Sequence, residues 1–181
     1  MSTIDDWLPE YQVSARYSIL VAASTEKTAA ALRKASFADL PIVRGLMRLR
    51  GYRLGNTKPT ASAAGEGCRF GSFLELASNS QEVVLGIAGR FWRPNGGIVR
   101  DLTAGGFRDF RRMGYAKAVW NFYVSPENGC SQLSTETRVQ TFGRPATVKF
   151  WLYWIAVGPF SGLMRKAMLR EVKRIAEQSE P

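Results

Sequence analysis

The sequence predicts an α+β protein in which an antiparallel sheet packs against one long C-terminal helix. A strand-like run, Leu133 to Val139, is followed almost at once by a helix-like stretch that reaches to about Glu177. Before it, several short apolar runs are separated by turn signals, which is typical of antiparallel strands. A curved sheet does not close fully against a single helix, so this order of elements favours a ligand pocket between them.

The first elements are a strand and two helices. Residues 11–22 alternate and are rich in Val, Ile, Tyr and Leu, which predicts the first strand. Ser24 or Thr25 then offers an N-cap for TEKTAAALRKAS, a helix of about three turns. Pro41 is well tolerated in a first helical turn, so residues 40–50 are predicted to form a second short helix.

A loop and a run of strands follow. The segment 51–71 is rich in Gly, Ala, Ser and Thr and lacks clear periodicity, so we expect a loop. Turn signals such as Asn79-Ser80 and Asn128-Gly129 separate the strands predicted after it. These strands are expected at 72–78, 82–92, 97–102, 115–124 and 131–142, with a loop or short helix at 104–114. No repeat or linker divides the chain, so 1–181 is expected to form one domain.

The C-terminal helix contains Gly158-Pro159, and an interior proline removes a backbone hydrogen bond and collides with the carbonyl of Ile155. We therefore expect a kink or a break. Apolar residues share one face on each side of it: Phe150, Trp151, Trp154 and Ile155 before, and Leu163, Met164, Ala167, Met168 and Ile175 after. The basic residues of the second half are expected mostly to face outward: Arg165, Lys166, Lys173 and Arg174.

Composition excludes several kinds of chemistry. The chain has no histidine, which excludes Ser-His-Asp and Cys-His nucleophiles and any histidine base. Cys68 and Cys130 belong to no CxxC pattern, so we expect neither a metal nor a cofactor. The N-terminus lacks the features of a secretory signal, and no run approaches the roughly 20 apolar residues that span a bilayer. We expect a cytoplasmic protein without a transmembrane segment.

The net charge of +10 raises the question of a nucleic-acid or anionic-lipid partner. The basic residues are spread along the chain and alternate with apolar positions on the helices, which is typical of solvated helix faces. We therefore expect no specific nucleic-acid partner. Contact with anionic lipid through the C-terminal helix stays an alternative, with Arg165, Lys166, Arg170, Lys173 and Arg174 as its residues.

Four sequence runs resemble a known superfamily: VLGIAGRFW at 84–92, LSTETRV at 133–139, YW at 153–154 and GPFSGL at 158–163. Together they look like a bacterial branch of the START-like superfamily, also called SRPBCC and polyketide cyclase-like, over about residues 10–178. The resemblance implies a helix-grip fold: a seven-stranded antiparallel sheet, two short helices after strand 1, and a long C-terminal helix over a cavity. Superfamily relatives bind lipids, polyketides, plant hormones or other hydrophobic ligands, and some are cyclases or dehydratases.

An aromatic set is the candidate ligand-binding site: Phe91, Trp120, Phe122, Phe150, Trp151 and Trp154. Such rings line pockets for apolar ligands, and they equally form cores. Burial of each ring stabilises the protein by roughly 2 kcal/mol in either case. The set is thus a candidate pocket lining, with pure core as the alternative.

Charged residues on the strands are the candidate polar groups. Period-two alternation places Arg90, Lys117, Glu136 and Arg138 opposite the apolar faces of their strands, as a cross-strand cluster on the exposed side. Alternatively a bulge turns Glu136 and Arg138 into the cavity, where they orient a carboxylate or carbonyl, as a base or a clamp.

The leading hypothesis is that this single domain, a monomer or homodimer, binds a small hydrophobic or amphipathic ligand between the sheet and the C-terminal helix. An alternative is a polyketide cyclase- or dehydratase-like enzyme with Glu136, Arg138 or Tyr153 as acid, base or clamp. A further alternative is that the chain is a basic peripheral protein that contacts anionic lipid.

Overall fold

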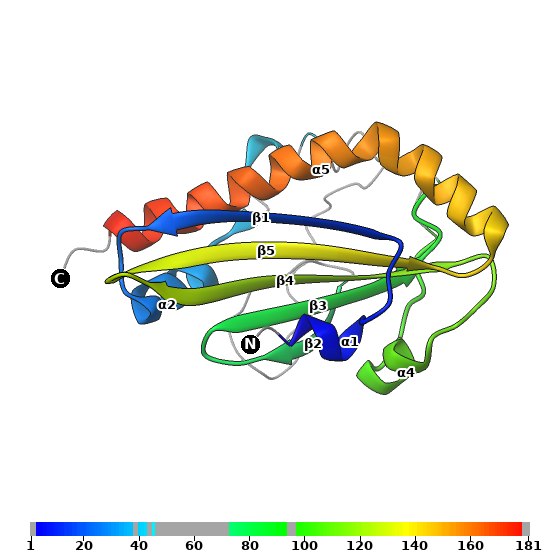
Figure 1. Ribbon diagram of the computed structural model, residues 1–181, viewed down its shortest axis with the longest axis horizontal. Helices are drawn as coiled ribbons and strands as arrows, with labels where there is room; N and C mark the ends of the chain where they lie inside the picture. Colours follow the sequence, from blue (N-terminus) through cyan, green and yellow to red (C-terminus); the bar gives the residue numbers. More distant parts are fainter. Residues whose placement is uncertain (1–2, 38–39, 43–44, 46–72, 94–96, 179–181) are drawn as a thin grey trace.

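The computed structural model describes residues 3–37, 40–42, 45, 73–93 and 97–178, which form an α+β structure with an antiparallel sheet and a long C-terminal helix (Figure 1). The strands are β1 (Val13–Val21), β2 (Leu74–Ser78), β3 (Glu82–Gly89), β4 (Ala116–Glu127) and β5 (Cys130–Thr141). The helices are α1 (Ile4–Trp7), α2 (Thr25–Lys34), α4 (Ala104–Asp109) and α5 (Arg144–Gln178). The five strands form one open sheet in the order β1-β5-β4-β3-β2.

The predicted strands are confirmed except at residues 97–102, which form no strand. The backbone N–H of Val99 donates to the carbonyl of Ala88 at 2.9 Å, but Asp101 then turns the chain at a φ of 59° and ends any extension. The described residues therefore form a five-stranded sheet rather than a seven-stranded one. Most of the helix expected at 40–50 and the whole loop expected at 51–71 lie outside the described residues.

The central hairpin sets the register of the sheet. β4 and β5 pair without interruption from Ala116↔Thr141 to Glu127↔Cys130. Asn128 and Gly129 close the hairpin with φ of 45° and 81°, the two positive values that a type I′ turn requires. An unbroken register means that residues of β5 alternate strictly between the two faces of the sheet.

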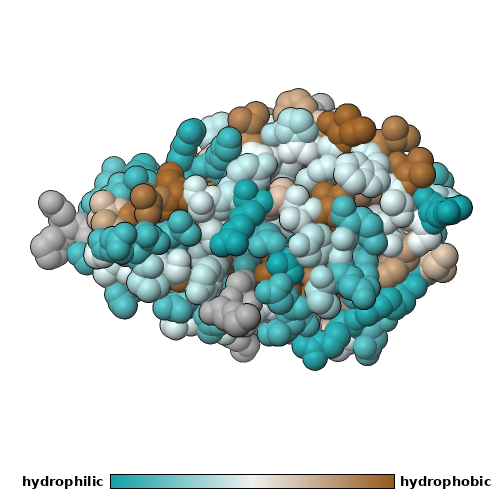
Figure 2. Space-filling model, in the orientation of Figure 1, coloured by the Kyte–Doolittle hydropathy of each residue, from teal (hydrophilic) through white to brown (hydrophobic). Residues whose placement is uncertain are grey.

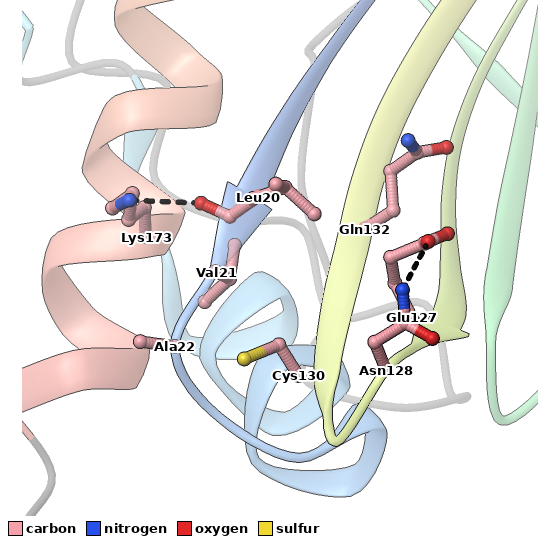
Figure 3. A pocket seen from close by; sticks show the side chains of 8 residues that line it. All are labelled: Leu20, Val21, Ala22, Glu127, Asn128, Cys130, Gln132 and Lys173. Atoms are coloured by element: carbon pink, nitrogen blue, oxygen red, sulfur yellow. Dashed lines mark hydrogen bonds between the residues drawn. The ribbon is translucent and has the colours of Figure 1, made fainter.

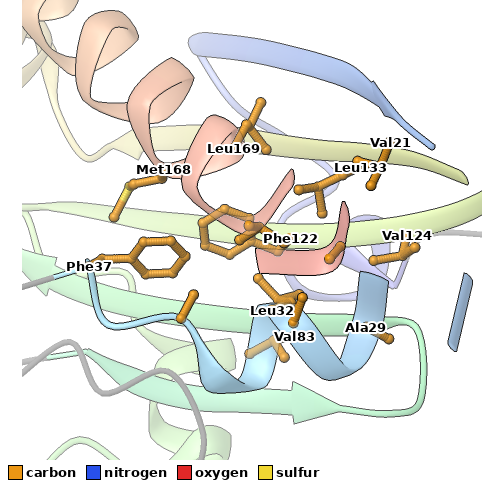
Figure 4. Close-up of a cluster of buried hydrophobic side chains, with 14 of the residues drawn as sticks. Val21, Ala29, Leu32, Phe37, Val83, Phe122, Val124, Leu133, Met168 and Leu169 are labelled. Carbon is orange, nitrogen blue, oxygen red and sulfur yellow. The ribbon is translucent and has the colours of Figure 1, made fainter. Parts of the chain in front are cut away.

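One face of the sheet packs against α2 and α5. Figure 4 shows Leu32 of α2, Phe122 of β4 and Met168 of α5 pointing toward one another in the largest hydrophobic cluster. Ser24 begins α2 as predicted, because its side chain accepts a hydrogen bond from the N–H of Lys27. The opposite face is covered in part by α1 and α4, through a smaller cluster of Ile4, Leu8, Leu76, Val84, Phe107 and Val119.

α5 is one helix of 35 residues that continues through Pro159. Figure 1 shows it bent over the sheet, so the expected proline effect is a bend and not a break. The helix is buried near its start, at Ala146 and Phe150, and again from Gly162 onward. No residue from 151 to 161 is fully buried, so the middle of α5 stands away from the core.

Candidate functional site

A layer of polar side chains lies on the α5 side of the sheet, between two hydrophobic clusters. On this face of β5, Leu133 belongs to one cluster and Val139 to another, and the two residues between them are Thr135 and Thr137. These hydroxyl groups lie near three larger polar side chains, those of Trp120, Tyr17 and Arg165. We call this set the Arg165 layer: Tyr17, Trp120, Thr135, Thr137 and Arg165.

Arg165 points inward because it belongs to the buried stripe of α5, with Gly162 three residues before it and Leu169 four residues after. Its side chain is 6% exposed, and its guanidinium carbon lies 4.1 Å from the centroid of the Trp120 ring. The prediction that Arg165 faces outward is therefore wrong. Helical spacing could have indicated the inward position, because Arg165 shares a stripe with buried residues of α5. The charge of arginine favoured a solvent position instead. The stripe is Gly162, Arg165, Leu169, Val172 and Ala176.

Thr135 connects this arginine to the sheet. The Oγ1 of Thr135 accepts hydrogen bonds from Arg165 Nη1 at 3.1 Å and from Trp120 Nε1 at 2.6 Å. The same hydroxyl donates to the carbonyl of Asn121 at 2.7 Å. Its one donor and both acceptor positions are thus used, and the network holds the guanidinium plane against the indole ring.

Arg165 has no carboxylate partner among the described residues. Burial lowers the pKa of the guanidinium to about 9, although nearby Tyr17 raises it in part, so the side chain stays cationic at neutral pH. A buried charge without a counter-ion is costly, and an anion placed beside it removes that cost. Of the five N–H donors of the guanidinium, one carries the bond to Thr135.

Thr137 contributes to the layer a buried hydroxyl that lacks a hydrogen-bond partner among the described residues. It is 8% exposed, and within the described part of the chain its Oγ1 has no hydrogen-bond partner. Thr137 pairs across the sheet with Trp120 on one side and Ala15 on the other. A buried hydroxyl without a partner costs about 1–3 kcal/mol, which a ligand acceptor or a bound water recovers.

A close approach of α5 to β1 positions the layer. A Cβ atom on Gly162 would lie 2.5 Å from the hydroxyl of Tyr17. Because glycine has no Cβ atom, α5 can approach β1 this closely at Gly162. The close approach brings the following turn of α5, which carries Arg165, near the sheet.

The structure divides the aromatic set that the sequence nominated. Trp120 and Phe122 lie together, with ring centroids 5.2 Å apart, in the cluster beneath α2 and the second half of α5. Phe150 contacts Phe91 and Trp154 in a separate cluster near the start of α5. Trp151 is 45% exposed and belongs to neither cluster.

Glu136 and Arg138 lie on the face opposite α5, since β5 has no bulge that would turn them. Arg138 Nε pairs with Glu136 at 2.6 Å, and its Nη1 pairs with Asp5 at 2.6 Å and donates to the carbonyl of Leu8 at 3.2 Å. The predicted face is thus correct, but the predicted exposure is wrong. The side chains of Arg138 and Glu136 are only 9% and 14% exposed, because α1 covers them. This cluster attaches α1 to the sheet.

Three more polar contacts on that face are structural. The carboxylate of Glu82 accepts from Thr3 N at 2.7 Å and from Asn121 Nδ2 at 2.7 Å, and Asn121 Oδ1 accepts from Glu136 N at 2.8 Å. No motif in the sequence pointed to this network. α1, whose N-cap is Thr3, is only four residues long and has no periodicity to detect.

Lys117 and Arg90 also depart from the predicted exposed cluster. Lys117 is 1% exposed, and its Nζ donates to the carbonyls of Phe107 and Arg108 at the end of α4. Burial, assisted by the charge of Arg111, lowers its pKa to about 8. Arg90 follows the end of β3, where its guanidinium lies 4.3 Å from the centroid of the Tyr115 ring. The remaining catalytic candidate, Tyr153, packs on Phe150.

A shallow pocket of about 380 Å³ lies at the far end of the sheet, beside the β4–β5 turn (Figure 3). Lys173 closes one side of it by donating from Nζ to the carbonyl of Leu20 at 2.8 Å. Its lining is Leu20, Val21, Ala22, Glu127, Asn128, Cys130, Gln132 and Lys173. These side chains form no nucleophile and base pair, and the pocket does not reach the Arg165 layer.

These elements define an α+β protein with an open five-stranded antiparallel sheet and a long C-terminal helix. No protein-family model matches the chain, and no curated protein matches it. A crystal structure of a protein from Thermus thermophilus aligns with 93% of this chain and 100% of its own length, at a TM-score of 0.37 and 8% identity. In the described part of the chain, no helix has the length and apolar character needed to cross a membrane.

Proposed function

We propose that the protein binds a small amphipathic molecule between the sheet and α5, with an anionic group of that molecule at Arg165. The observation that carries the proposal is the buried guanidinium, which has no carboxylate partner among the described residues and lies on the face that also presents the unpartnered hydroxyl of Thr137. A structural arginine in a core normally has its charge paired, as Arg138 does.

The chemistry of the layer fits a carboxylate or a similar planar anion. A guanidinium binds carboxylates through two parallel N–H donors, and the contact with the Trp120 ring and the bond to Thr135 limit how the guanidinium can turn. Thr137 supplies a further donor on the same face of β5. The apolar part of the ligand would contact the aromatic residues on either side of the layer, among them Phe122 and Phe150.

The same proposal assigns the chain to the START-like superfamily with a helix-grip arrangement. Its support is the order of the elements: a strand, α2, a run of antiparallel strands and then a long helix across the face of the sheet. The incomplete burial of α5 between residues 151 and 161 is also what a helix over a ligand site requires.

No observation favours the cyclase or dehydratase alternative. Glu136 and Arg138 engage α1 on the opposite face, while Tyr153 lies on α5 beside Phe150. The three residues do not converge on one volume, so we propose binding without turnover by these groups.

The first test is native mass spectrometry of the freshly purified protein, followed by organic extraction and analysis of any released compound. The second is titration with a fluorescent anthroyloxy fatty acid and with its methyl ester, which differ only in the anionic group. We expect the acid to bind at least about tenfold more tightly than the ester. We also expect Arg165→Met to abolish this difference, with exposed Lys166→Met as the matched control.

The outcomes separate the two parts of the proposal. If neither probe binds and no compound is released, ligand binding between sheet and helix is contradicted. If acid and ester bind equally well, ligand binding stands and the role of Arg165 is contradicted.

A further inference from the structure

The part of α5 that precedes Arg165 presents large apolar side chains to solvent. Five of them that share one side are between 45% and 69% exposed, and we call them the α5 apolar face: Val148, Trp151, Leu152, Ile155 and Leu163. Their helical spacing places them on one side of the helix, since Leu152 and Ile155 follow Val148 by four and seven residues. Figure 2 shows hydrophobic residues along the upper edge of the molecule, where α5 runs in Figure 1.

Cations extend this face at both ends. At 100° per residue, Arg144 projects on the same side of the helix as Val148, and so do Lys166 and Arg170 in the second half. All three are exposed. The sequence has no Asp or Glu between Glu136 and Glu171, so no carboxylate of α5 neutralises this side of the helix before Glu171.

We propose that the α5 apolar face docks on the surface of an anionic lipid bilayer, with the helix lying in the plane of the interface. Apolar side chains with a tryptophan among them, flanked by lysine and arginine, are the composition of interfacial helices. The apolar residues enter the acyl boundary, and the three cations meet lipid phosphates. α5 lies flat in this arrangement, because it is not apolar enough to cross the membrane.

Charge distinguishes this partner from a second copy of the chain. A two-fold contact between two α5 apolar faces would bring Arg144 and Lys166 of each copy against the same cations of the other, without a carboxylate of this part of α5 to pair them. A negatively charged surface meets the same cations favourably. The inference concerns the outer side of α5, so it stands or falls independently of the ligand proposed at Arg165.

The test is vesicle flotation of the full chain with phosphatidylcholine alone and with phosphatidylcholine containing phosphatidylglycerol, at low and at high salt. We expect at least about tenfold stronger binding to the anionic vesicles, weakened by salt. The double variant Leu152→Gln/Ile155→Gln should lose about tenfold or more of this binding. Leu20→Gln is the matched control, because Leu20 is 56% exposed on β1, beside Lys173 and outside the α5 apolar face, and this variant should bind as the wild type does.

A second readout locates the contact. Brominated anionic lipids should quench part of the tryptophan fluorescence, and Trp151→Phe should remove that part. Equal binding by Leu152→Gln/Ile155→Gln and the wild type, or no binding to anionic vesicles, would overturn the inference. A solution dimer that the double variant dissociates, seen by sedimentation equilibrium, would assign the face to a second copy and overturn it as well.

Discussion

The guanidinium of Arg165 and the indole of Trp120 are stacked at 4.1 Å and donate to the same hydroxyl oxygen, that of Thr135. The pair joins the second half of α5 to the centre of the sheet. Since the guanidinium has no carboxylate partner among the described residues, its charge is not balanced as that of Arg138 is. This difference leads to the first prediction.

Arg165→Met and Arg138→Met should differ in their effect on stability. Arg165→Met removes a buried charge and leaves no carboxylate unpaired, so the free energy of unfolding should stay within about 1 kcal/mol of the wild type. Arg138→Met leaves Glu136 largely buried without its partner and releases Asp5 and the Leu8 carbonyl, which should cost about 3 kcal/mol. Urea denaturation of both variants measures this. A loss at Arg165 as large as the loss at Arg138 would show that Arg165 is a purely structural residue.

Gly162→Ala should destabilise the protein even though alanine is the better helix former. The added Cβ would lie 2.5 Å from the Tyr17 hydroxyl and 3.2 Å from Tyr17 Cζ, so either the ring or α5 must move. We expect a loss of about 1–3 kcal/mol. Tyr17→Phe removes the closest atom and should restore part of the loss in the double variant. Thermal denaturation of both single variants and the double variant tests the coupling, and strictly additive effects would contradict it.

Lys117 should make stability depend on alkaline pH. The pKa of Lys117 is about 8 in the folded state, against an ordinary value of 10.5 that applies to the unfolded chain. Between these two values the unfolded state binds more protons, so the free energy of unfolding should rise with pH, by about 2 kcal/mol in total. Below pH 8 both states are protonated, and this contribution no longer changes. Urea denaturation across the window should show the rise in the wild type and a flatter profile in Lys117→Met, because other groups that titrate there are common to both proteins.

Asn121→Ala should destabilise the protein by about 2–3 kcal/mol. The amide of Asn121 is 3% exposed and joins Glu82 of β3 to the N–H of Glu136 in β5. Its removal takes a donor from a buried carboxylate and an acceptor from a backbone N–H. Gln81→Ala, at an exposed position beside Glu82, should change stability by less than about 0.5 kcal/mol in the same denaturation experiment. Equal effects of the two substitutions would contradict the role of the network.

Local patterns in the sequence were sufficient for the five strands, α2 and α5, but not for α1. The alternation of residues 11–22 predicted β1, Ser24 marked the start of α2, and Asn128-Gly129 marked the turn of the central hairpin. These signals are local because strand alternation, N-caps and type I′ turns depend on residues only a few positions apart. The prediction of a strand at 97–102 was wrong for two reasons. Among the described backbone hydrogen bonds, only the one at Val99 joins this segment to β3, and the chain then turns at Asp101 with a positive φ that the sequence did not indicate.

The sequence by itself determined which residues share a face of a strand or helix, and so it separated Thr135 and Thr137 from Glu136 and Arg138. Only the tertiary structure decided what covers each face. α1 buries Arg138 with Asp5, 133 residues away in the chain, and the contact of Gly162 with Tyr17 draws Arg165 into the interior. Both outcomes depend on contacts between distant segments, whose energies no local pattern records. For that reason the charge of Arg165 predicted a solvent position, and packing of α5 on the sheet placed it inside.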